Sequence, residues 1–120
     1  MPYWGSNPED NDFAFDAVGA YVFLIKDQMF RDMENVLEKS YPEQAIIASL
    51  KCLRLLADEF PKCVSIHFRK KHLEQCKTAF ENWFTAVKEN LPTEYADAIQ
   101  SKAHAEFELF EEQVLHKKQP

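Results

Sequence analysis

The 120-residue sequence contains only two glycines, Gly5 and Gly19, which lie fourteen positions apart. This spacing excludes the glycine-rich loops that bind phosphates and the dinucleotide-binding fingerprint, because both need clustered glycines. Tight β-hairpins also rely on glycine, so few could form here. The scarcity of glycine therefore argues against a nucleotide cofactor bound through a glycine-rich loop, and against a hairpin-rich fold.

Long apolar runs are also absent. The longest, Ala20 to Ile25, has six residues, whereas a membrane-spanning helix needs about 20. The first residues lack the basic and apolar regions of an export signal. The three cysteines Cys52, Cys63 and Cys76 are an odd number, which is typical of reduced thiols. We therefore expect a cytoplasmic protein without a membrane partner.

The net charge is −6, from 20 acidic and 14 basic residues. All of the excess lies in residues 1–60, which carry 11 acids and 5 bases. Proteins that bind nucleic acids need clustered Lys and Arg, so we expect no nucleic-acid partner. The one basic run, Arg69-Lys70-Lys71-His72, is interpreted as a solvated helix face, with a phosphate-binding patch as the alternative.

Apolar residues recur every three or four positions in four segments, at about 12–39, 42–57, 61–91 and 93–114, which Pro42, Pro61 and Pro92 separate. This is the helical period. Regular seams and short joints favour nearly antiparallel packing. The sequence therefore predicts one all-α domain, a four-helix up-down bundle, preceded by an irregular N-terminal arm over residues 1–11.

Two stretches leave the choice between helix and strand open, namely Val18–Ile25 and Cys63–Phe68. Helix is favoured because a two-stranded sheet is marginally stable in water. Four aromatic residues fit the helical seams least well, and if exposed they would suit a protein-binding surface; they are Phe13, Tyr41, Phe68 and Trp83.

Two Cys/His pairs have the i, i+4 spacing that could chelate a metal, Cys63 with His67 and His72 with Cys76. On one continuous helix the two pairs would face opposite sides, whereas a closed zinc site needs four converging ligands. The Glu-x-x-His motif of di-iron bundles is missing from the sequence. We therefore predict no metal, no cofactor and no catalytic residues.

The N-terminal stretch 4–16 contains an unusual set of residues, Trp4, Gly5, Ser6, Asp10, Asn11, Asp12, Ala14 and Asp16. In this respect it resembles the N-terminal signature of the bacterial domain-of-unknown-function family 4259. The resemblance implies a small helical bacterial protein and brings no known activity.

These observations predict a non-enzymatic, acidic protein-binding module, with a toxin-neutralising immunity protein as one form of it. The candidate partner-binding residues are Trp4, Asp10, Asp12 and Asp16. Alternatively, the acids of this stretch cap the first helix and stabilise its dipole. Two further hypotheses stay open. One is a self-associating structural protein that forms a homodimer, and the other is a metal-dependent enzyme that uses Cys63, His67, His72 or Cys76.

Overall fold

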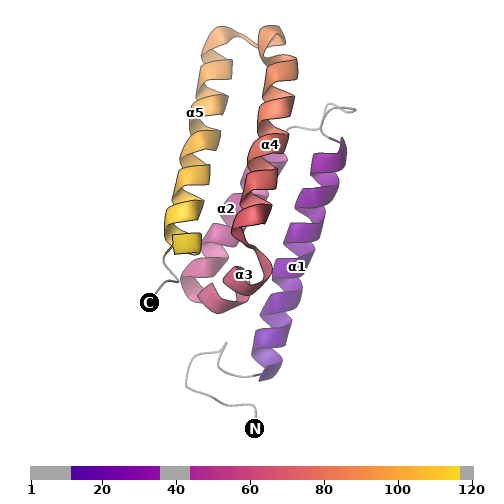
Figure 1. The fold of residues 1–120 in the computed structure, drawn as a ribbon, viewed down its shortest axis with the longest axis vertical. Coiled ribbons are helices and arrows are strands. Elements are labelled where there is room, and N and C mark those ends of the chain that lie inside the picture. Colours follow the sequence, from indigo (N-terminus) through magenta and orange to yellow (C-terminus); the bar gives the residue numbers. More distant parts are fainter. Residues whose placement is uncertain (1–11, 36–43, 117–120) are drawn as a thin grey trace.

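The computed structural model describes residues 12–35 and 44–116, and every secondary-structure element in these ranges is a helix. The all-α prediction is thus confirmed (Figure 1). The elements are α1 (Asp12–Asn35), α2 (Gln44–Glu59), α3 (Pro61–His67), α4 (Lys70–Val87), the 3-10 turn η2 (Lys88–Asn90), α5 (Thr93–Phe110) and the π-helical turn η3 (Glu111–His116).

The long helices α1, α2, α4 and α5 follow one another in alternating directions, and the short α3 turns the chain between the lower ends of α2 and α4 (Figure 1). Helix α1 packs on α2 and α3, while α5 packs on α2 and α4. The stretch Val18–Ile25 lies within α1, so the strand alternative is wrong there. Pro42 and Tyr41 lie outside the described residues.

The core is built from the predicted apolar seams. In α2 it takes Ile46, Leu50, Leu53 and Ala57, which are all buried. These residues recur every three or four positions, so they project from one side of the helix. Cys52 belongs to the same apolar run but is exposed, because it lies between two seam residues and faces outward.

The prediction of a single helix over residues 61–91 is wrong, and the described ranges contain five α-helices where four were expected. Phe68 (φ −122°, ψ 111°) and Arg69 (φ −111°, ψ 175°) are extended and separate α3 from α4. The extended backbone turns Phe68 into the core, where it is fully buried. Its ring lies 5.0 Å from that of Phe110 and 5.4 Å from that of His72. The stretch Cys63–Phe68 is therefore helical as far as His67, and its strand alternative is also wrong.

Aromatic side chains join α4 to α5. The ring of Phe80 stacks on Phe84 at 5.7 Å and meets Phe107 edge-on at 6.0 Å. Trp83 is buried beside Phe80 and Phe84. Trp83 and Phe68 therefore belong to the core, so they do not meet the condition of exposure on which a protein-binding role depended, whereas Phe13 is exposed.

A bidentate ion pair ties α2 to α5. Arg54 Nε donates to Glu106 Oε2 at 2.6 Å, and Arg54 Nη2 donates to Glu106 Oε1 at 3.1 Å. The two side chains are 13% and 8% exposed. The hydrogen bond that Arg54 donates to Glu106 raises the pKa of Arg54 against the opposing effect of burial. Since buried charges need such partners, the pair fixes how α2 and α5 align.

The burial of Phe68 predicts that Phe68→Ala lowers the free energy of unfolding by about 3–5 kcal/mol, through lost transfer energy and a residual cavity. Phe23→Ala is the matched control, because Phe23 is exposed on α1 and should change stability by less than about 0.5 kcal/mol. Urea denaturation measures both. Equal losses for the two variants would contradict the role given to Phe68.

The ion pair predicts a non-additive pattern. Glu106→Leu alone leaves the buried Arg54 without its carboxylate partner, with only the neutral amide of Gln113 within 3.4 Å, and should cost about 3–5 kcal/mol of stability. Adding Arg54→Met should recover much of that loss, since the buried charge is then gone. Glu108→Leu, at an exposed position of α5, is the control. A double variant no more stable than Glu106→Leu would show that the charge is not the cause.

Candidate functional site

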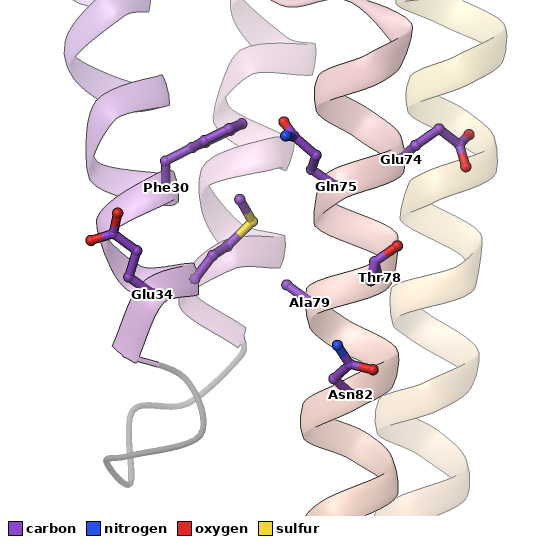
Figure 2. Close-up of a pocket in the computed structure, with 8 residues that line it drawn as sticks. Phe30, Glu34, Glu74, Gln75, Thr78, Ala79 and Asn82 are labelled. Atoms are coloured by element: carbon purple, nitrogen blue, oxygen red, sulfur yellow. The ribbon is translucent and has the colours of Figure 1, made fainter.

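A groove of about 520 Å³ lies between the C-terminal half of α1 and the middle of α4. Figure 2 shows its two carboxylates, Glu34 and Glu74, pointing away from each other. Glu74 Oε2 instead lies 3.3 Å from Lys77 Nζ on the same helix. The ring of Phe30 points across the gap towards Gln75 (Figure 2). The described residues that line this groove thus provide no converging pair of carboxylates, the arrangement with which one carboxyl group acts as acid and the other as base.

The outward side of α1 carries exposed apolar side chains. We define the α1 face as Ala17, Ala20, Tyr21, Phe23 and Leu24, all exposed. Tyr21 is 60% and Leu24 is 62% accessible to solvent. The opposite side of the helix supplies Val22 and Met29 to the core. Helix α1 is therefore apolar on two sides over its first three turns.

A shallow groove of about 510 Å³ runs beside the α1 face. Its polar side chains are Asp16 from α1 and His67 from the end of α3. A Cβ atom added at Gly19 would lie 3.1 Å from His67 Nε2. Gly19 therefore lets the His67 ring approach the α1 backbone, which agrees with the close helix packing expected for a glycine within a helix.

The surface of α1 is acidic. The helix contains five acidic and two basic residues. Lys26 Nζ donates to the carbonyl oxygen of His67 at 3.0 Å, and Arg31 Nε lies 3.0 Å from Asp27 Oδ2. Both basic side chains are therefore engaged, and Asp16 is left as an exposed carboxylate next to the α1 face.

The residues considered for metal chemistry do not form a shared site. Within residues 12–35 and 44–116, no three His, Cys, Asp or Glu side chains are grouped closely enough to hold a metal ion. Cys63 and Cys76 are buried. Burial raises the pKa of Cys76 to about 12, which keeps its thiol protonated. His72 Nδ1 accepts a hydrogen bond from the backbone N–H of Arg69 at 2.9 Å.

The residues predicted to bind a partner are only partly described. Trp4 and Asp10 lie outside the described residues, and Asp12 is the first residue of α1. Asp16 is exposed and lines the groove beside the α1 face. Sequence reasoning missed Tyr21 and Leu24. The signal for them in the sequence is the stretch of residues 13–25, whose one charged residue is Asp16. This stretch has more apolar side chains than one side of a helix can bury, so some of them must lie on another side.

Comparison with known proteins returned no match among protein-family models, curated proteins or solved structures. The resemblance of residues 4–16 to family 4259 therefore stays a prediction. Over the described ranges, every helix is too short or too polar to cross a bilayer.

The contact between Gly19 and His67 predicts coupled effects on stability. Gly19→Ala should gain about 1 kcal/mol from helix propensity, but the new Cβ must displace the His67 ring. In a His67→Ala background Gly19→Ala should show the full gain in the free energy of unfolding. In the unmodified background the gain should be smaller. A double-mutant cycle from urea denaturation measures the coupling. The same gain in both backgrounds would show that the ring does not restrict this position.

Proposed function

We propose that this chain is a non-enzymatic, cytoplasmic protein-binding module whose α1 face receives an apolar, basic segment of a different protein. The observation that carries the proposal is the row of exposed Tyr21, Phe23 and Leu24 on a helix whose other side is already packed into the core. Exposed aromatic and aliphatic side chains gathered on one surface are typical of protein interfaces.

The spacing of the α1 face suits a helical partner. Ala17, Ala20, Tyr21 and Leu24 occupy positions i, i+3, i+4 and i+7 of one helix, which is the pattern by which helices pair along an apolar seam. From Ala17 to Leu24 the helix rises about 10 Å. A surface of this length fits two turns of a partner helix, and it is small for a stable dimer interface of about 800 Å² per partner.

The acidic residues of α1 favour a partner segment that carries basic residues. Asp16 lies at one end of the α1 face, and α1 has an excess of acidic residues. Complementary charges favour encounter and suppress wrong partners, so Lys or Arg beside the partner's apolar side chains fits this surface. A second copy of the chain would place one acidic helix against another, which disfavours self-association through the same face.

The partner-binding residues predicted from the sequence fit a docking surface at the start of α1. Asp12 and Asp16 are separated by four positions at the start of α1, so they are neighbours along one helix side. We retain Trp4, Asp10 and Asp12 as candidate contact residues together with Asp16. A toxin-neutralising immunity protein is one biological setting for such a module.

A designed peptide with the chemistry expected of the partner tests the proposal. The probe is a fluorescent amphipathic helix of Leu, Ala and Lys, and its counterpart has Glu in place of every Lys. Anisotropy titration should show binding of the basic peptide at least about tenfold tighter than that of the acidic one. Tyr21→Ala/Leu24→Ala should weaken binding by at least about tenfold.

Tyr95→Ala/Leu109→Ala is the matched control, since both residues are exposed apolar side chains on α5. This control should change affinity less than about twofold. Equal effects of the two double variants would overturn the α1 face as the docking surface. Sedimentation of the unmodified chain is the second measurement. A dimer that Tyr21→Ala/Leu24→Ala abolishes would make a second copy the occupant and would overturn the choice of a different protein.

A further inference from the structure

The break between α3 and α4 borders a cavity of about 850 Å³. Helix α1 contributes Lys26 to its wall, the end of α3 contributes His67, and the extended Phe68–Arg69 link and the first turn of α4 close it. We define the basic pocket by its charged and titratable lining residues, which are Lys26, His67, Arg69, Lys70, Lys71 and His72.

The cations of the basic pocket are poorly neutralised. None of the described residues that line it is acidic. Lys26 Nζ and Arg69 Nε donate to the neutral carbonyl oxygens of His67 and Ile66, at 3.0 and 3.3 Å. Such bonds orient the two cations without cancelling their charge. In the described part of the chain, no carboxylate forms a salt bridge with Lys71.

Lys70 lies close to a carboxylate, and that carboxylate is shared. Lys70 Nζ lies 3.2 Å from Glu111 Oε2, and Lys77 Nζ lies 3.6 Å from Glu111 Oε1. Lys77 Nζ also lies 3.3 Å from Glu74 Oε2, so two carboxylates face these two lysines. The cations without a carboxylate partner among the described residues are Lys26 on α1, Arg69 in the link between α3 and α4, and Lys71 on α4. They give the pocket a net positive charge, in a chain whose total charge is −6.

His72 reports the resulting positive potential. Burial lowers its pKa first, and the charges of Lys26, Lys71 and Arg69 lower it further. A like charge disfavours protonation of the imidazole. The three cations that act on this ring lie around the same pocket, so they also repel one another. A bound anion would relieve that repulsion.

The backbone adds donors to the same wall. The first N–H groups of an α-helix have no acceptor within the helix, and the start of the 18-residue α4 lines the basic pocket. The N–H of Arg69 donates to His72 Nδ1 and the N–H of His72 donates to the carbonyl oxygen of Arg69, so the backbone donors at this wall are those of Lys70 and Lys71. An oxyanion placed there would accept from ammonium, guanidinium and backbone donors together. Phosphate is the anion whose geometry and charge suit such a set.

We propose that the basic pocket binds a small phosphate-class oxyanion, either free phosphate or the phosphate group of a small metabolite. Lys71 and Arg69 supply exposed cationic donors, and Lys26 contributes a third from α1. The pocket volume leaves room for an organic group attached to the phosphate. This assignment is independent of the α1 face and adds a second, oppositely charged binding surface to the molecule.

Calorimetry with inorganic phosphate and with glycerol 3-phosphate, each against sodium chloride at equal ionic strength, tests the proposal. Saturable binding of one or both is expected, and the tighter ligand distinguishes free phosphate from a phosphate ester. Arg69→Gln/Lys71→Gln should weaken binding at least about tenfold. Lys51→Gln/Lys102→Gln, at exposed positions of α2 and α5, removes the same charge elsewhere and should change affinity less than about twofold.

The proton NMR signals of the His72 ring provide a readout of location. Phosphate should shift them at constant pH and ionic strength in the unmodified chain and in the control variant, and not in Arg69→Gln/Lys71→Gln. No saturable binding of either ligand would overturn the proposal. Equal binding by both double variants would also overturn it, as would shifts that sodium chloride reproduces.

Discussion

The burial of Phe68 is the constraint on which the arrangement of the helices depends. Its ring is fully buried against Phe110, and an extended backbone at Phe68 and Arg69 is needed to place it there. That requirement ends α3, starts α4 and directs α4 along α5. It also opens the cavity in which Lys26, Lys71 and His72 meet. A single buried side chain thus determines both the helix topology and the position of a charged site.

The sequence was informative where one helix buries one regular seam. The period of apolar residues in α1, α2 and α5 predicted helices whose buried residues include Val22, Leu50 and Phe107. The joints at Pro61 and Pro92 also match helix starts, because proline suits the first turn or the position before it. These features are local, so periodicity and punctuation suffice to find them.

The features that the sequence did not reveal depend on tertiary contacts. The break at Phe68 involves neither glycine nor proline. Its signals in the sequence were that Phe68 did not fit the seam of the following helix and that Cys63–Phe68 left the choice between helix and strand open. Trp83 did not fit either and is nevertheless buried, since the α4–α5 packing covers a broader face than one seam. The α1 face was missed because its residues looked buried in the sequence and are exposed in the structure. An apolar stretch from 13 to 25 suggests burial on several sides, and only the packing shows that Tyr21 and Leu24 are exposed.

The π-helical turn η3 changes the spacing at which the C-terminal residues face the core. Phe110 and Leu115 are both buried although five positions separate them, an interval that would place them about 140° apart on an α-helix. A π-turn accommodates one additional residue per turn. A chain shorter by one residue here could present the same apolar side chains from an ordinary α-helix. The extra residue of η3 therefore lets two side chains separated by five positions reach the same core.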